Sequence, residues 1–207
     1  MQISFKQQLT RNIQNIPGWR TKRKIVVIES DDWGSVRMSS KKSFDYFLSK
    51  GLEVDKCPYN SNDALESNED LELLFDVLNG VKDMNGNPAI LTANNIVANP
   101  DFEKIKKDNF QKYHYELFTD TLKKYPRHDR VIQLYKEGIS RKIIQPQSHS
   151  REHVNVALWM KTLQEKDELS HMAFEQNMFS VHPSAKPKYK DEFMDAYGSN
   201  ENINKKK

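Results

Sequence analysis

The chain has 207 residues, of which 37% are hydrophobic and 10% aromatic, and its 32 basic and 29 acidic residues give a net charge of +3. This length is enough for one domain with its own core, and the aromatic content argues against general disorder. The near balance of charge excludes a nucleic-acid binder that works mainly by electrostatic attraction. A single cysteine, Cys57, excludes an intramolecular disulfide and a metal cage built of thiolates.

Targeting signals are the next feature that the sequence can be tested for. No apolar run approaches the roughly 20 residues that span a bilayer. The first 23 residues also lack the apolar stretch of roughly 7–15 residues that marks a signal peptide. We therefore expect a cytoplasmic chain without an integral membrane segment.

The first half of the chain predicts one strand between helices. Residues 1–23 form a polar N-terminal segment with an amphipathic helix that ends at Pro17 and Gly18. The apolar, β-branched residues 24–29 predict a buried strand of the kind found in parallel sheets. Helices are expected over residues 41–50, stopped by Gly51, and over residues 68–81, with a loop between them.

Two more strands are predicted in the second half, at residues 88–94 and 142–149. We expect Gly138 to end the helix that precedes the later strand. The alternation of strands and helices predicts an α/β fold with a parallel sheet, whose site lies at the carboxyl ends of the strands. The expected helices are at residues 99–107, 120–125, 129–138, 154–164 and 167–179, and residues 112–118 are a strand or an extended loop.

Two polar clusters come directly after predicted strands. Asp31 and Asp32 follow the first strand, and His149 and His153 follow the third. If a helix begins at His149, the two imidazoles share one of its faces. Two imidazoles and one carboxylate, with a fourth position open, are the ligand set of a catalytic zinc site, and the second carboxylate is left free to act as a base. Separately, each pair also fits a plain role, as a helix cap or as exposed side chains.

These clusters carry a resemblance to a known family. Residues 30–32 (SDD) resemble the paired-aspartate first motif of the NodB-homology polysaccharide deacetylases, and residues 149–153 (HSREH) resemble their second motif, His-[Ser/Thr]-x-x-His. Two longer segments also look like those of the branch of this family that is found with bacterial surface-polysaccharide genes. They are LTANNIVANPDFEKI and PQSHSREHVNVALWMK. The resemblance covers residues 24–180. It implies a distorted (β/α) barrel of the glycoside hydrolase/deacetylase type, complete or partial, over residues 24–197.

The resemblance also implies an activity and roles for single residues. The family uses a divalent metal to remove acetyl groups from sugars. By position, Asp31 resembles the general base, and Asp32, His149 and His153 resemble the metal ligands; Ser150 resembles the residue whose hydroxyl braces the second motif. Zn²⁺ is the expected metal for two imidazoles and a carboxylate. The implied substrate is an N-acetylated carbohydrate, in a polysaccharide or a lipid-linked precursor.

Other residues near the motifs allow two interpretations each. Trp33 is either a stacking platform for a sugar or a packing residue beneath the site. Asn94 contacts either substrate hydroxyls or a loop backbone. Glu152 is expected to support the ligands or to form a salt bridge rather than to react. His182 follows a strand-like triplet, but its surroundings do not match the motif that carries the family's acid histidine.

The sequence also departs from the family. Neither the arginine-containing third motif nor the late histidine motif is found, and only 207 − 153 = 54 residues follow His153. A barrel needs several strand–helix units after the second motif, and residues 198–207 read as a disordered basic tail. We therefore expect a C-terminally truncated or degenerate member. Two hypotheses stay open: an active metal-dependent deacetylase, and a remnant that binds metal or carbohydrate without turnover.

Overall fold

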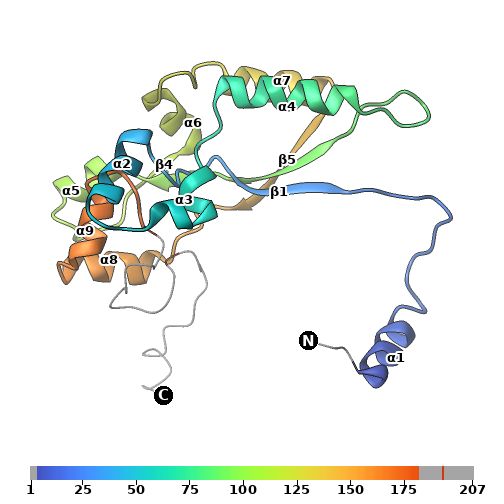
Figure 1. The fold of residues 1–207 in the computed structure, drawn as a ribbon, viewed down its shortest axis with the longest axis horizontal. Helices are drawn as coiled ribbons and strands as arrows, with labels where there is room; N and C mark the ends of the chain where they lie inside the picture. The colour runs from blue at the N-terminus through green and yellow to red at the C-terminus, as the bar shows by residue number, and fades with distance from the viewer. Residues whose placement is uncertain (1–3, 182–192, 194–207) are drawn as a thin grey trace.

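The computed structural model describes residues 4–181 and residue 193. Within them the fold is mixed α/β and is built around a small parallel sheet (Figure 1). Its three strands are β1 (Ile28–Trp33), β2 (Leu91–Ile96) and β5 (Ile144–Ser150), in the spatial order β1-β2-β5. Both pairings are parallel. This confirms the predicted α/β class and the parallel sheet, while the barrel stays a prediction.

The first strand begins later than the sequence predicts. The apolar run of residues 24–29 was expected to be the strand, but the ladder with β2 starts only at Ile28, opposite Leu91, and runs to Trp33. The reason is that a strand is defined by its partner as well as by its own residues. Residues 24–27 are extended but have no ladder partner, whereas residues 30–33 lie beside the end of β2.

Two helices cover one face of the sheet. Helix α4 (Asn68–Gly80) connects β1 to β2, and helix α7 (Val131–Ser140) precedes β5; both lie along this face in Figure 1. A capping box fixes the start of α4, because the Ser67 hydroxyl accepts from the Asp70 backbone and the Asp70 carboxylate accepts from the Ser67 backbone. The main core lies between these helices and the strands and includes Leu71, Phe75, Leu91, Ala93, Leu134, Ile143 and Ile144.

Gly138 does not end its helix, as the sequence suggested, but lies inside α7 and is buried. A Cβ placed on it would meet Ile144 Cγ2 at 2.5 Å and Phe75 Cζ at 2.6 Å. The glycine is needed because α7 approaches β5 and α4 too closely for any side chain. Its role is packing rather than termination.

Shorter helices surround the carboxyl ends of the strands. They build two further cores, one around Trp159 and Phe174 and one around Phe47 and Met178. The predicted loop before α4 contains a short helix, and the predicted helix over residues 167–179 is shorter than expected. The elements are α2 (Lys41–Ser49), η1 (Val54–Lys56), α3 (Pro58–Asn62), β3 (Ala98–Pro100), α5 (Phe102–Lys107), β4 (Tyr115–Leu117), α6 (Phe118–Thr121), η2 (Leu122–Lys124), α8 (Val156–Gln164) and α9 (Glu168–Phe174).

The opposite face of the sheet is polar. Side chains alternate along a strand, so the residues next to the buried Leu91, Ala93 and Ile144 point to this second face. They are Glu29, Asp31, Thr92, Asn94, Gln145 and Gln147, all exposed or half-buried. We call these six residues the open face.

The N-terminal helix α1 (Phe5–Gln14) is shorter than predicted and buries none of its residues. A capping box between Ser4 and Gln7 fixes its start. Figure 1 shows α1 away from the sheet, at the end of the chain segment that leads into β1. It is therefore held by its local sequence and not by the core.

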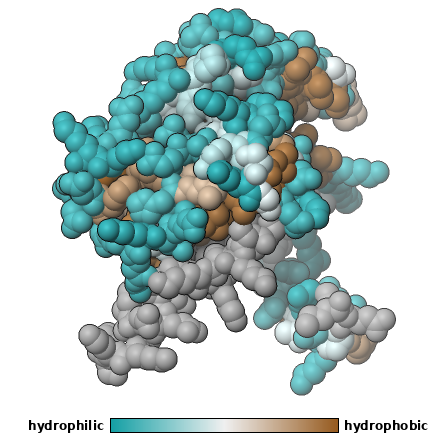
Figure 2. Space-filling view, turned by 60° about the vertical axis from the view of Figure 1, so that its left-hand side comes forward, coloured by the Kyte–Doolittle hydropathy of each residue, from teal (hydrophilic) through white to brown (hydrophobic). Residues whose placement is uncertain are grey.

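The face drawn in Figure 2 is largely hydrophilic where it is coloured, with hydrophobic side chains in separate patches. Among the described residues no helix combines the length and the apolar character that crossing a bilayer requires. His182 and the predicted tail at residues 198–207 lie outside the described residues.

Candidate metal centre

Both sequence motifs lie at irregular strand ends. Ser30 pairs with Ala93 and Trp33 with Asn95, so Asp31 and Asp32 together oppose a single residue of β2. A second register shift leaves His149 as the extra residue of β5. Such bulges re-aim side chains and are common beside active sites.

The backbone around the bulges is also unusual. Asp32 has φ 65° and Ser150 has φ 144°, values that side-chain-bearing residues adopt rarely. Conformations of this kind cost about 1–3 kcal/mol each and persist where the surrounding fold imposes them. Strain at both motifs is consistent with a site whose geometry has been selected for a function.

All three predicted ligands, Asp32, His149 and His153, come together. Oδ1 of Asp32 lies 3.7 Å from Nε2 of His149 and 3.8 Å from Nδ1 of His153, and the three atoms lie within 4.8 Å of one another. A tetrahedral zinc with bonds of about 2.0–2.2 Å has ligand atoms about 3.3–3.6 Å apart. The two distances from Asp32 are slightly longer than this spacing, so small movements of the side chains would bring the three atoms to the separations of such a site.

Two buried atoms of this cluster have no hydrogen-bond partner in the part of the chain that the structure describes: Oδ1 of Asp32 and Nδ1 of His153. A buried acceptor without a partner is costly, and metal coordination is one way in which such groups are satisfied. Two imidazoles and one carboxylate form a donor set suited to Zn²⁺ and to other divalent ions. The residues present therefore fit a metal ion.

The histidines do not meet on a helix, as the sequence argument assumed. His149 belongs to β5, His153 lies in the connection after it, and α8 begins only at Val156. Their ring centroids are 5.6 Å apart and their planes are inclined by 32°. The turn at Ser150, whose hydroxyl donates to the Glu152 carbonyl at 3.0 Å, brings the two rings to the same side.

Arg37 holds the carboxylate of Asp32, a contact that the sequence did not reveal. Its Nη2 donates to Oδ2 of Asp32 at 2.6 Å, and its side chain is only 11% exposed. The two oxygens of the carboxylate are thereby divided: Oδ2 bonds to the arginine and Oδ1 faces the histidines. Because Arg37 lies in an irregular loop five residues after Asp32, no periodic pattern could have identified it.

Asp31 is not part of the three-residue cluster. It lies on the open face, and its Oδ1 accepts a hydrogen bond of 2.7 Å from Nδ2 of Asn94. Asn94 therefore contacts the carboxylate of Asp31 rather than a loop backbone. The amide orients this exposed carboxylate and leaves its second oxygen available for a proton.

The remaining candidates have supporting contacts. Glu152 is buried and forms a two-point ion pair with Arg151, whose Nη2 donates to Oε1 at 2.6 Å. The guanidinium also lies over the Tyr115 ring, 4.8 Å from its centroid. Trp33 is half-buried against the main core, which favours its packing role. These side chains lie outside the three-residue cluster, and their contacts are of a supporting kind.

A buried acid behind the loop after β1 was missed as well. Oε2 of Glu66 accepts from the Gly34 backbone at 3.0 Å, and Oε1 accepts from the Tyr135 hydroxyl at 2.9 Å. Nδ2 of Asn95 donates to the same hydroxyl at 3.0 Å. Burial raises the pKa of Glu66 above its ordinary value, and the hydrogen bonds oppose that rise. These three hydrogen bonds join residues more than 30 positions apart in the sequence, so no local motif predicts them.

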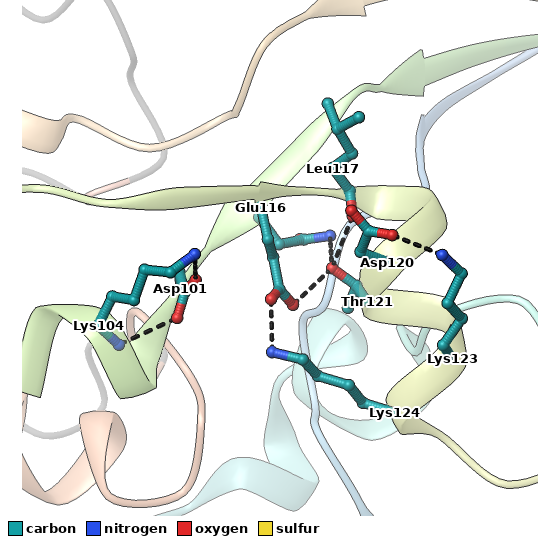
Figure 3. A network of polar contacts seen from close by, with 9 residues as sticks. Asp101, Lys104, Glu116, Leu117, Asp120, Thr121, Lys123 and Lys124 are labelled. Atoms are coloured by element: carbon teal, nitrogen blue, oxygen red, sulfur yellow. Dashed lines mark hydrogen bonds and ion pairs between the residues drawn. The ribbon is translucent and has the colours of Figure 1, made fainter.

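The segment that follows Asp32 is fixed from a second side. Asn99 accepts from the Val36 backbone at 3.0 Å and donates to the Gly34 carbonyl at 2.8 Å. Its amide also contacts the Thr121 hydroxyl, which donates to Glu116 at 3.0 Å. Figure 3 shows the outer part of this network around Glu116 and Thr121. The position of Asp32 is thus set by buried hydrogen bonds on both sides of its loop.

No family model, curated protein or solved structure matches the chain. The assignment of a family therefore stays a prediction, and functional inference has to start from the geometry of the site.

Proposed function

We propose that the chain is a metal-dependent carbohydrate deacetylase that hydrolyses an acetyl group from an N-acetylated sugar. The observation that carries the proposal is the convergence of Asp32, His149 and His153, whose ligand atoms lie within 4.8 Å of one another, with two buried atoms that have no hydrogen-bond partner among the described residues. A base candidate, Asp31, lies next to this cluster in sequence and is exposed. A metal site with a carboxylate nearby is an arrangement that can hydrolyse an amide or an ester.

Each side chain has a separable role in this proposal. Asp32, His149 and His153 would hold the metal, and Arg37 keeps the Asp32 carboxylate turned toward the histidines. When bound, the divalent ion supplies Lewis-acid chemistry, which polarises an acetyl carbonyl and lowers the pKa of water to about 7. Asp31, oriented by Asn94, accepts the proton of the attacking water.

The substrate class follows from the surroundings of Asp31. The open face presents amide, hydroxyl and carboxylate groups, such as Thr92, Asn94 and Gln147, which can exchange hydrogen bonds with sugar hydroxyls. An N-acetyl amino sugar in a polysaccharide or in its lipid-linked precursor fits this face. The chemistry is the same for either source.

A second candidate is metal or carbohydrate binding without turnover. It is favoured by the openness of the site, since the two histidine side chains are each 33% exposed. A cavity of about 520 Å³ lies near Ser40, Glu116 and His128, and its lining includes none of the three ligands. Catalysis usually benefits from a pocket that excludes water, and the described residues do not enclose this centre.

Acetate release distinguishes the two candidates. The protein, loaded with zinc, is incubated with chitooligosaccharides, and acetate is measured for the wild type, Asp31→Asn and the control Glu168→Gln, at an exposed position of α9. We expect release by the wild type, loss of about 10²-fold or more in Asp31→Asn with zinc content unchanged, and near-normal release by Glu168→Gln. Zinc binding without acetate in the wild type would favour the binding candidate. Equal rates for the wild type and Asp31→Asn would contradict the proposed base.

A further inference from the structure

The segment that leads into β1 is apolar and exposed. Residues 24–27 are extended, and Val26 and Val27 are 85% and 68% exposed. Ile25 is 53% and Ile28 39% exposed, so four consecutive apolar side chains face solvent. Figure 1 shows this segment continuing the line of β1 away from the sheet. Such a segment carries free N–H and C=O groups and is a template for pairing with another strand.

This segment also belongs to an edge of the sheet. The strand order β1-β2-β5 leaves one side of β1 without a neighbour among the described strands. Residues 24–27 have no ladder partner on either side within residues 4–181. A strand added here would therefore extend the existing sheet without displacing any described pairing.

The charges at the two ends of the segment are complementary. Arg23 and Lys24 precede the apolar residues and Glu29 follows them, and Glu29 is exposed. An antiparallel partner with the same sequence brings the basic end of one strand to the acidic end of the other. The segment is thus self-complementary in charge, with an apolar centre.

Symmetry selects one register. In an antiparallel pair of identical strands related by a two-fold axis, one residue must face its own copy, because neighbouring residues point to opposite faces of the sheet. With Val26 on the axis, Arg23 faces Glu29 and Ile25 faces Val27, twice each. With Val27 on the axis, Ile25 would face Glu29. With Ile25 on the axis, Arg23 would face Val27. Only the Val26 register matches charge with charge and apolar with apolar on this face.

We propose that the chain forms a two-fold symmetric dimer through antiparallel pairing of residues 23–29, which joins two three-stranded sheets into one of six strands. The partner is a second copy of this chain. Two Arg23–Glu29 pairs flank the contact, and Ile25, Val26 and Val27 form its apolar centre. On the other face, the aliphatic stem of Lys24 lies along Ile28 of the second copy.

Charge reversal tests this register directly. The molar mass of the full chain is measured by light scattering after size exclusion, over a concentration series. The wild type is expected at twice 24.3 kDa. Arg23→Glu and Glu29→Arg each place like charges at both ends of the contact, and each should raise the dimer dissociation constant about tenfold or more. Lys136→Glu, at an exposed position of α7, is the matched control and should leave the mass unchanged.

Two combinations make the test specific. The double variant Arg23→Glu/Glu29→Arg restores both pairs and should dimerise like the wild type. An equimolar mixture of the two single variants should form the mixed dimer, because every contact in it joins opposite charges. Far-UV circular dichroism checks that each variant is folded.

Three results would overturn the proposal. One is a monomeric wild type whose residues 24–28 are protected from hydrogen exchange, since another segment of the same chain would then cover the strand. A second is a monomeric wild type without that protection. A third is a dimer that persists in both single variants, because its interface would lie elsewhere.

Discussion

The two faces of the sheet are built on different principles. The face under α4 and α7 carries Leu91, Ala93 and Ile144, each 5% exposed or less. These side chains are part of the main core. The open face, one residue further along the same strands, carries carboxylates, amides and a hydroxyl. The same three strands therefore provide both a core and a polar surface, and the alternation of side chains separates them.

The difference shows where stability and function lie. Substitutions on the covered face remove packing, whereas substitutions on the open face remove groups that can bind a ligand. The strand ends join the two faces, because the bulges at Asp32 and His149 turn these side chains out of the regular alternation. The predictions below test this separation, beginning with the largest expected effect.

Phe75→Ala should have the largest effect on stability. Phe75 is 2% exposed and touches the core between α4, α7 and β5, so its truncation leaves a cavity. We expect a loss of about 3–5 kcal/mol in the free energy of unfolding, measured by urea denaturation. Gln145→Ala, on the open face, is the control and should change it by less than about 0.5 kcal/mol. Similar losses in the two variants would remove the distinction between the faces.

Gly34→Ala should disturb the loop after Asp32, at the end of β1. Gly34 has φ 82°, and a Cβ on it would lie 2.8 Å from the Ile96 carbonyl oxygen and 3.1 Å from the Phe118 ring. Gly86 also has a positive φ, 80°, but nothing lies within 4 Å of a Cβ there. Gly86→Ala should therefore cost only the backbone strain, about 1–2 kcal/mol, and Gly34→Ala clearly more.

Zinc binding provides the second readout for this pair. Because Gly34 lies two residues after Asp32, Gly34→Ala should also weaken zinc binding, and Gly86→Ala should not. The two variants are compared by urea denaturation and by titration with zinc. Equal unfolding losses and equal zinc affinities would show that the loop tolerates a side chain.

Glu66→Gln should change how stability depends on pH. Burial raises the pKa of Glu66 in the folded chain above its ordinary value of 4.5. A carboxyl with a raised pKa contributes stability below that ordinary value, and this contribution is lost as pH rises through the folded pKa. The wild type should therefore lose stability relative to Glu66→Gln as pH increases above 4.5.

Urea midpoints measured over a series of pH values check this slope. Glu168→Gln, at an exposed position of α9, is the control for replacing a carboxyl with an amide. A constant difference between the wild type and Glu66→Gln at all pH values would contradict the assigned burial effect. A slope of the opposite sign would do the same.

Asn94→Ala should have the smallest effect on stability but a measurable one on activity. It removes one hydrogen bond to the exposed carboxylate of Asp31, so the free energy of unfolding should change by no more than about 1 kcal/mol. If Asp31 is the base, acetate release should fall by about tenfold, the equivalent of 1.4 kcal/mol. Unchanged release would show that the Asp31–Asn94 contact is not used.

Much of the sheet could be predicted from the sequence because its signals are local. The apolar runs at residues 24–29, 88–94 and 142–149 predict strands, and the helices predicted over residues 41–50 and 68–81 begin where α2 and α4 begin. Asp32, His149 and His153 could be predicted to meet because each follows a strand of one parallel sheet. The helix assumed for the two histidines was wrong, since a strand end with a bulge produces the same proximity.

The supporting residues could not be found in this way. Glu66 contacts Gly34 across 32 positions, and Arg37 reaches Asp32 from an irregular loop. The start of β1 depends on where β2 begins, because the ladder starts at Ile28 opposite Leu91. The residues of β1 alone do not predict that position. These features arise from tertiary contacts, and propensity or spacing along one chain does not report them.

Zinc stoichiometry is the most direct test of the central claim. Metal content is measured by elemental analysis after zinc loading and buffer exchange, for the wild type, Asp32→Asn, His153→Ala and the control His171→Ala. His171 bonds to the Leu163 carbonyl and lies outside the cluster. The account predicts about one zinc per chain in the wild type and the control, and loss in both cluster variants. Absence of zinc in the wild type, or full retention in Asp32→Asn and His153→Ala, would contradict the metal centre.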